Sequence, residues 1–321
     1  MKKYPLLLSP AGKDYLWGGE KLKRDYSKDI DLAPLAETWE CSCHPDGPST
    51  VSNGEYAGRT LSSVLEENPD WMGEGPGSAN CFPILFKLID AKRDLSVQVH
   101  PDDEYAKKHE NSLGKTEMWY VLDAEAGAEL IYGFKKRIDR DTFIRSAKDG
   151  TITEYLNKVK AKRGDVFFIL PGTVHAIGAG LVIAEIQQSS NVTYRLYDFG
   201  RRDANGDLRP LHVEKAADVA DLSVKKITPN EKRESFELGG AMCETLSSCK
   251  YFSVRKVSVE GSYKINIGNA SFEVFFCADG EASVSYVDGK MKIKKGDTLF
   301  FPAGIGDVSF SGKAVLLEIT C

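Results

Sequence analysis

Two histidines, one glutamate and one glutamine stand at spacings that could gather them around one metal ion. Gln98 and His100 lie in a stretch where apolar and polar residues alternate, as in a β-strand with one face on a core. Their side chains are therefore expected on one wall. Glu117 opens another predicted strand, and His175 follows a Pro-Gly turn. This set of nitrogen and oxygen donors suits Zn²⁺ with a coordination position left open.

Cationic side chains near these donors could bind an anionic substrate. The chain has neither a P-loop nor a G-x-G-x-x-G pattern, so nucleotide binding is not expected and a phosphate would be held by side chains. The candidates for substrate contact are Ser96, Lys87, Lys115 and Arg195, with Arg201 and Arg202 also open. Lys87 has an alternative role, as a core-edge lysine with its ammonium group in solvent.

Glu185 lies in a predicted strand and alternates with Ile183 and Gln187. It is a candidate base or proton shuttle. The alternative is a structural carboxylate paired with Arg195 or Lys115. His44, His109 and His212 are interpreted as structural, because an isolated histidine needs only a hydrogen-bond partner.

Composition narrows the class of protein. The chain has 321 residues and a formal net charge of -5, which argues against a broad nucleic-acid-binding face. No apolar run reaches the roughly 20 residues of a membrane span, and the N-terminal stretch has no signal-peptide core. The seven cysteines are expected to be free thiols in a reducing cytoplasm, the Cys41-x-Cys43 pair included.

Short apolar runs bounded by glycine, proline and aspartate predict a mainly β fold. Residues 163–175 resemble residues 295–306, which indicates two copies of one barrel unit, and the second copy has Gly306 where the first has His175. We expect residues 1–220 to form a catalytic barrel and residues 221–321 a degenerate barrel without a metal site. Residues 221–235 are the expected linker.

Three helices are expected. One covers residues 60–67 and another residues 101–109. A third begins near Thr151, because Thr151 and Glu154 have capping-box spacing and apolar residues follow at helical intervals. It belongs to a small helical insertion near residues 135–160.

The order of a histidine strand, a glutamate and a Pro-Gly-x-x-His turn resembles the cupins. More narrowly, the chain resembles the short bacterial form of the type I mannose-6-phosphate isomerases from about residue 4 to 213. The segments that carry this resemblance are Tyr15-Leu-Trp-Gly-Gly19, Ala36-Glu-Thr-Trp-Glu40, Leu95-Ser-Val-Gln-Val-His-Pro-Asp-Asp103, Gly114-Lys-Thr-Glu-Met118, Pro171-Gly-Thr-Val-His-Ala176 and Tyr194-Arg-Leu-Tyr-Asp-Phe-Gly-Arg201.

The resemblance implies two cupin-like β-barrels of the jelly-roll type and a zinc-dependent isomerase that interconverts mannose 6-phosphate and fructose 6-phosphate. It implies metal ligands at His100, Glu117, His175 and Gln98, and catalytic roles for the residues Arg195, Lys115 and Glu185. Long family members have His-Lys-Pro-Glu where this chain has Gly114-Lys-Thr-Glu117, so any role of that histidine is absent.

Two other functions stay open at this stage. One is a non-catalytic sugar-phosphate-binding cupin, which would bind metal and ligand without turnover. The other is an Fe²⁺ cupin oxygenase, whose site would hold more histidines. The expected partner is a small-molecule sugar phosphate, with no nucleic acid and no membrane, and a homo-oligomer is left open.

Overall fold

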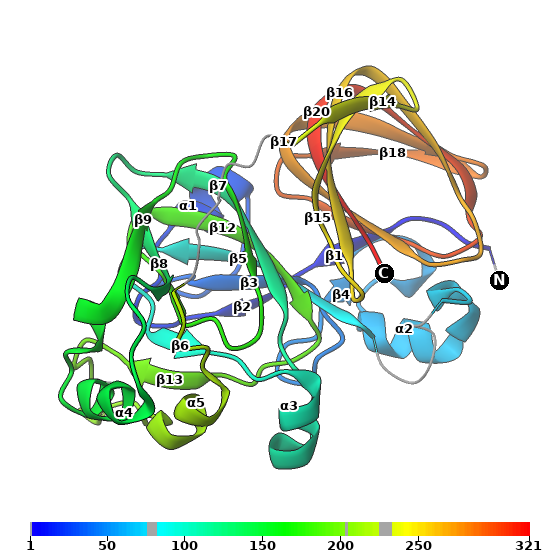
Figure 1. Cartoon of the computed structure of the whole chain (residues 1–321). Helices are drawn as coiled ribbons and strands as arrows, with labels where there is room; N and C mark the ends of the chain where they lie inside the picture. Colours follow the sequence, from blue (N-terminus) through cyan, green and yellow to red (C-terminus); the bar gives the residue numbers. More distant parts are fainter. Residues whose placement is uncertain (1, 76–81, 203–204, 225–232) are drawn as a thin grey trace.

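The computed structural model describes residues 2–75, 82–202, 205–224 and 233–321. Figure 1 shows a mainly β molecule in which two β-rich bodies lie side by side. The helices are short: α1 (Lys21–Tyr26), α2 (Leu61–Glu67), α3 (Asp103–Glu110), α4 (Arg140–Lys148) and α5 (Val213–Val219). The 3₁₀ turns include η1 (Gly54–Tyr56), η2 (Pro69–Met72) and η4 (Ile152–Tyr155).

The first body contains a six-stranded and a five-stranded antiparallel sheet. The six-stranded sheet has the order β10 (Val166–Ile169), β7 (Glu117–Ala124), β12 (Leu181–Gln188), β5 (Ile84–Ala91), β3 (Glu37–Cys41) and β2 (Ala11–Lys13). The five-stranded sheet has the order β13 (Tyr194–Tyr197), β6 (Val97–Val99), β11 (His175–Ile177), β8 (Glu129–Phe134) and β9 (Leu156–Lys160).

Alternating side chains divide each of these sheets into an inner and an outer face. On β7, Trp119 and Val121 pack inward with Leu130 of β8 and Ile177 of β11, which joins the two sheets. The outer face of the five-stranded sheet packs against α4 and α5 through a cluster that includes Val97. The space between the two sheets is therefore an apolar core at one end and is free for polar groups at the other.

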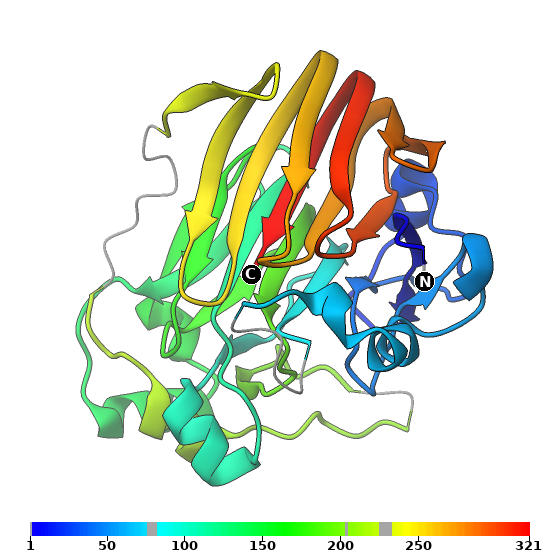
Figure 2. The ribbon, with the colours of Figure 1, turned by 90° about the vertical axis from the view of Figure 1, so that its right-hand side faces the viewer.

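The second body is a nine-stranded sheet. Its order is β14 (Ser235–Leu238), β15 (Ala241–Ser248), β16 (Ser253–Ile267), β20 (Gly306–Thr320), β17 (Glu273–Tyr286), β19 (Thr298–Phe301), β1 (Leu6–Ser9) and β4 (Thr50–Val51), with β18 (Gly289–Lys294) paired to β17. Figure 2 shows these long strands standing over the first body. A shared core joins them to the outer face of the six-stranded sheet, with Phe86 of β5 5.3 Å from Phe276 of β17 between ring centroids.

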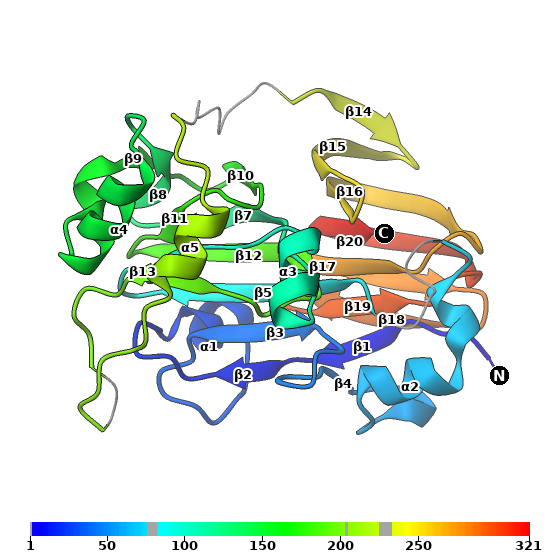
Figure 3. The same cartoon turned by 60° about the horizontal axis from the view of Figure 1, so that its bottom comes forward.

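The prediction of two closed barrels is not confirmed, because none of the described sheets closes on itself. The N-terminal β1 pairs with β19 near the other end of the chain, so the nine-stranded sheet includes residues from both ends. Figure 3 shows β2 in the first body leading back to β1 in the second. The division at residue 220 stays a prediction. Most of the expected linker, residues 225–232, lies outside the described residues.

Two of the three expected helices are confirmed as α2 and α3. The third is wrong beyond Tyr155, since η4 gives way to the strand β9. Val159 pairs with Leu130 of β8, and this ladder overrides the local helical spacing. The long strand β16 runs without a break through Gly261, which has a φ of 110° and pairs with Gly312 of β20.

Five cysteines in the described part of the chain are free thiols: Cys41, Cys243, Cys249, Cys277 and Cys321. Within the same residues no helix is long and apolar enough to cross a membrane.

Candidate metal centre and active site

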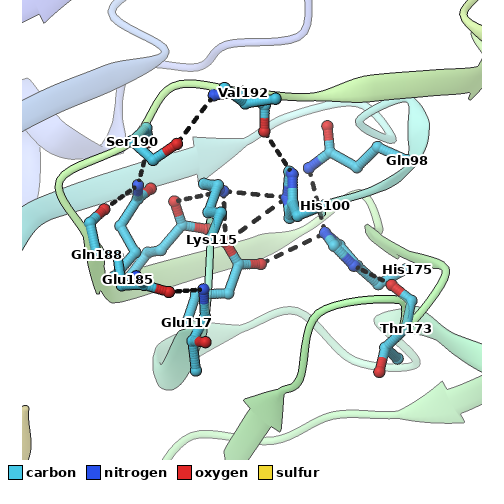
Figure 4. Close-up of polar contacts among 12 residues, drawn as sticks. Gln98, His100, Lys115, Glu117, Thr173, His175, Glu185, Gln188, Ser190 and Val192 are labelled. Carbon is cyan, nitrogen blue, oxygen red and sulfur yellow. Dashed lines mark hydrogen bonds and ion pairs between the residues drawn. The ribbon is translucent and has the colours of Figure 1, made fainter. Parts of the chain in front are cut away.

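The predicted donors come from both sheets of the first body and meet between them. Gln98 of β6 pairs in register with His175, the first residue of β11, and His100 follows β6 by one residue. Glu117 opens β7 on the facing sheet. Figure 4 shows the side chains of His100, Glu117 and His175 converging, with Gln98 at the edge of the group. Strand alternation therefore places these side chains as predicted.

The turn before His175 explains the Pro-Gly pair. Gly172 has a φ of 81°, a conformation that residues with a side chain rarely adopt. A Cβ built there would lie 2.8 Å from the carbonyl oxygen of Val219, so a larger residue would also clash. The glycine lets the chain turn closely enough for His175 to point into the space between the two sheets.

His100, Glu117 and His175 form a compact buried group. Their potential ligand atoms all lie within 4.8 Å of one another, and the three residues are 1%, 0% and 0% exposed. His175 Nε2 is 3.3 Å from Glu117 Oε1, and His100 Nε2 is 3.7 Å from Glu117 Oε2. One ion could contact all three residues.

Backbone carbonyls fix the protonation of both imidazoles. His100 Nδ1 lies 2.8 Å from the carbonyl oxygen of Val192, and His175 Nδ1 lies 2.8 Å from that of Thr173. A carbonyl only accepts hydrogen bonds, so each Nδ1 carries the proton and each Nε2 presents a lone pair to the space between the two sheets. This outer support is typical of histidines that bind metals.

Burial keeps these imidazoles neutral. Burial and the Lys115 ammonium group lower the pKa of His175 to about 4. The same two causes hold the pKa of His100 well below its ordinary value. Burial, and after it the nearby Glu185 carboxylate, raises the pKa of Glu117 to about 7 against the opposing effect of Lys115. A divalent cation could be coordinated by these two neutral imidazoles and by the carboxyl group of Glu117, which makes few hydrogen bonds.

The orphaned oxygen of Glu117 supports this conclusion. Glu117 Oε1 is buried without a hydrogen-bond partner and faces the lone pair of His175 Nε2. Such a buried carboxylate is costly unless a cation contacts it. The Lys115 ammonium group meets the other oxygen, Oε2, and lies 3.1 Å from His100 Nε2. The residues present therefore fit a metal ion.

A second group of charges extends the site along the six-stranded sheet. Glu185 of β12 pairs in register with Lys87 of β5 on one side and Trp119 of β7 on the other. Its carboxylate lies 3.6 Å from Lys87 Nζ and 3.8 Å from Lys115 Nζ, and it accepts a 2.8 Å hydrogen bond from Trp119 Nε1. Burial alone would raise the pKa of Glu185, but the two lysines and the indole outweigh burial and lower it. Glu185 is thus ionised beside the donors.

Lys87 is buried, which excludes the alternative with its ammonium group in solvent. It lies 3.8 Å from Glu37 Oε2 and 4.9 Å from the ring centroid of Trp39, both on β3. Burial would lower the pKa of Lys87, but Glu37 and Glu185 outweigh it and raise that pKa. The Lys87 ammonium group therefore stays charged in the space between the two sheets.

Arg195 lies on the other sheet, two strands from His175, because it pairs with Gln98. Of the two partners considered for Glu185, Lys115 lies 3.8 Å from it and Arg195 does not pair with it. Arg195 Nη1 donates to the carbonyl oxygen of Pro210 at 3.0 Å, and Nε is buried without a hydrogen-bond partner. Within the described ranges no carboxylate forms an ion pair with Arg195. Ser96 is buried next to β6, and no hydrogen bond of its hydroxyl group is found among the same residues.

Several residues of the site were not anticipated from the sequence. Glu37 belongs to the segment Ala36-Glu-Thr-Trp-Glu40, whose spacing could have marked it. Gln187 pairs with Glu117, and its Oε1 is buried without a partner. Arg209 lies 3.5 Å from Asp198 Oδ2 and is close enough to Arg195 to lower its pKa, after burial. The carbonyls of Val192 and Thr173 had no signal, because every residue has a carbonyl.

These features define a mainly β protein with a buried group of residues that fits a metal ion and an ionised carboxylate beside it. Residues 6–131 match the model of the phosphomannose isomerase type I catalytic domain, and residues 242–320 match that of the mannose-6-phosphate isomerase cupin domain. The chain is 39% identical to mannose-6-phosphate isomerase ManA of Bacillus subtilis, over 98% of each chain. It is 38% identical to mannose-6-phosphate isomerase of Streptococcus mutans, over 96% of this chain and 95% of the relative.

A solved structure agrees with the sequence comparisons. The crystal structure of the mannose 6-phosphate isomerase from Bacillus subtilis has a TM-score of 0.90 and 34% identity, and the match covers 98% of this chain and 99% of that one. The chain therefore belongs to the type I mannose-6-phosphate isomerase family.

Proposed function

We propose that the protein interconverts mannose 6-phosphate and fructose 6-phosphate by moving a proton between C1 and C2 of the open-chain sugar. The observation that carries the proposal is the neighbourhood of a His–Glu–His metal group and the ionised Glu185, bridged by Lys115. The reaction needs a polarised carbonyl and a base close to the same two carbons. A purely ligand-binding protein has no need for a charged base beside the metal.

We infer that the ion is Zn²⁺, held by His100, Glu117, His175 and the amide oxygen of Gln98. Zinc takes mixed nitrogen and oxygen ligands and leaves a position open in catalytic sites. Gln98 Nε2 lies 3.3 Å from His175 Nε2, and the nitrogen and oxygen of an amide exchange places by a half-turn. Bound zinc would supply Lewis-acid polarisation of the carbonyl oxygen of the sugar.

Glu185 is the proposed base. Its carboxylate would take the proton from C2 of the aldose and return it to C1, while the proton of the C2 hydroxyl group passes to O1, which yields the ketose. The reverse transfers run the reaction backward. Lys115 would donate a hydrogen bond to the sugar oxygen that gains negative charge during the transfer. Lys87 would hold Glu185 ionised and contact the sugar, and Ser96 would contact a hydroxyl group.

The phosphate is proposed to lie at Arg195. Two strand spacings separate Arg195 from His175, which amounts to roughly 10 Å at about 4.8 Å per strand. An extended six-carbon sugar phosphate spans a comparable length between its carbonyl and its phosphorus. The unpaired Nε of Arg195 and the nearby Arg209 would supply charge-assisted hydrogen bonds.

We retain residues 1–220 as the catalytic unit and residues 221–321 as a unit without a metal site of its own. Phosphorylated sugars do not cross membranes unaided, so we place the reaction in the cytoplasm. No ligand beyond the sugar phosphate and the ion is needed for this chemistry.

Turnover of mannose 6-phosphate tests the proposal. Purified protein should form fructose 6-phosphate in a coupled assay, and Glu185→Gln should lower kcat by about a thousandfold while metal content stays unchanged. His109→Ala is the control, because His109 lies in the last turn of α3 and does not belong to the His100, Glu117 and His175 group. Metal-loaded protein that binds mannose 6-phosphate without converting it would show a binding protein instead.

A further inference from the structure

The backbone on either side of Lys115 is held by hydrogen bonds that lead to one carboxylate. Asp103 is the first residue of α3, and its Oδ1 accepts hydrogen bonds from the backbone N–H of Gly114 at 3.0 Å and from Gln188 Nε2 at 2.8 Å. Gln188 Oε1 in turn accepts the N–H of Thr116 at 2.8 Å. Asp103 therefore fixes the residues on both sides of Lys115.

The second oxygen of Asp103 is held from the nine-stranded sheet. Asp103 Oδ2 accepts a hydrogen bond from the hydroxyl group of Tyr251, in the turn between β15 and β16. Lys250 Nζ lies 3.5 Å from the same oxygen, but its side chain is 72% exposed and this pair contributes little. Tyr251 is partly buried against the core that joins the two bodies. The hydroxyl of Tyr251 is thus the main link from this turn to Asp103.

The Lys115 segment packs closely against the start of α3. A Cβ built on Gly114 would lie 2.5 Å from the backbone carbon of Asp102 and the backbone nitrogen of Asp103. The N–H of Lys115 donates to the carbonyl oxygen of Pro101 at 3.0 Å. The start of α3 therefore holds the backbone at Gly114 and Lys115 in place, and Tyr251 holds the start of α3 through Asp103.

We propose that Tyr251 is a positioning residue for Lys115, through which the metal-free C-terminal sheet takes part in catalysis. The chain of contacts runs from the Tyr251 hydroxyl to Asp103, to Gly114 and Gln188, and then to the backbone on either side of Lys115. The proposal rests on the proposed function for its effect on rate. Its structural part, that Tyr251 orders the Lys115 segment, stands without it.

Tyr251→Phe removes the hydroxyl group alone. We expect kcat to fall about tenfold, because a misplaced catalytic group loses its alignment in the transition state, while KM stays within about twofold and metal content is unchanged. Tyr105→Phe is the matched control: it also removes a tyrosine–aspartate hydrogen bond, the 3.1 Å bond from Tyr105 on α3 to Asp218 on α5, away from the Lys115 segment. It should leave kcat unchanged.

A double-mutant cycle separates positioning from general loosening. In a Lys115→Met background, Tyr251→Phe should lower kcat no further, since the group that it positions is gone. An equal loss in both backgrounds, or no loss in either, would overturn the proposal. Lys115→Met with full activity would instead remove Lys115 from the proposed chemistry.

Amide exchange tests the structural part even if the protein does not isomerise mannose 6-phosphate. The N–H groups of Gly114 and Lys115 should exchange about tenfold faster in Tyr251→Phe than in wild type or Tyr105→Phe. Unchanged protection at both positions would show that Tyr251 does not order the segment. Absent turnover in wild-type protein with faster exchange in Tyr251→Phe would count against the proposed function only.

Discussion

The chemistry of the site depends on how single side chains are oriented by groups with no chemistry of their own. The carbonyls of Val192 and Thr173 hold the two imidazoles with their Nε2 atoms toward Glu117. The indole of Trp119 does the same for Glu185, as a donor to one carboxylate oxygen. Each of these contacts favours one protonation state, which makes its contribution measurable by titration.

Trp119→Phe should move the acidic limb of the pH profile of kcat/KM to higher pH. The indole hydrogen bond favours ionised Glu185, so its loss raises the pKa of that base, and a higher pH is then needed to ionise it. Trp71→Phe is the control, because Trp71 is buried in the core that joins the two bodies and its indole makes no hydrogen bond within the described residues. An acidic limb at the same pH in both variants would show that Glu185 is not the group that titrates.

Strands carry the second level of organisation, and their alternation was readable from the sequence. It placed Gln98 beside His100 and Glu185 beside Gln187 because side-chain direction in a strand depends only on parity. The facing of the two sheets and the cross-strand register were not readable, since both depend on pairing between distant segments. Leu95 shows the limit: parity alone would put it on the same face as Val97, but it precedes β6 and packs inside.

The nine-stranded sheet contains a carboxyl pair that its register explains. Glu273 pairs with Thr320 and Glu318 with Phe275, so the two acids are diagonal neighbours on one face. Burial, and after it the Glu318 carboxylate, raises the pKa of Glu273 from an ordinary 4.5 to about 8. Between these pH values the folded state binds more protons than the unfolded state, so the free energy of unfolding falls as pH rises through this window.

Glu273→Gln should therefore stabilise the protein at high pH only. We expect a gain of up to about 5 kcal/mol in the free energy of unfolding at pH 9 and almost none at pH 4, where both states are mostly protonated. Denaturant titration at the two pH values measures this gain, with the exposed Glu281→Gln as the control. A gain of equal size at both pH values would mean that charge is not the cause.

At the scale of the molecule, buried polar contacts join the two bodies next to the active site. The Lys28 ammonium group lies 2.7 Å from Glu40 Oε2, which also accepts a 2.8 Å hydrogen bond from Thr298 of β19. Glu40 follows Trp39 on β3, at the point where the register of β3 with β5 shifts. The nine-stranded sheet therefore supports β3 at Glu40 as well as the Lys115 segment at Tyr251.

Lys28→Met should destabilise the whole protein. It leaves the fully buried Glu40 without its cation, at a cost of about 3 kcal/mol in the free energy of unfolding, and adding Glu40→Gln should restore part of that loss. Urea unfolding of both variants measures the effect, with the exposed Lys2→Met as control. If Lys28→Met alone is as stable as wild type, the Lys28–Glu40 pair does not stabilise the contact between the two bodies.

The central claim is that His100, Glu117 and His175 hold one divalent ion on which turnover depends. Zinc titration of chelator-treated protein, with bound metal and isomerase rate followed together, tests it most directly. We predict that activity returns in proportion to zinc up to one ion per chain, and that Glu117→Gln and His175→Ala bind no stoichiometric zinc while His109→Ala behaves as wild type. Chelator-treated protein that isomerises mannose 6-phosphate at the full rate with no bound metal would contradict the claim.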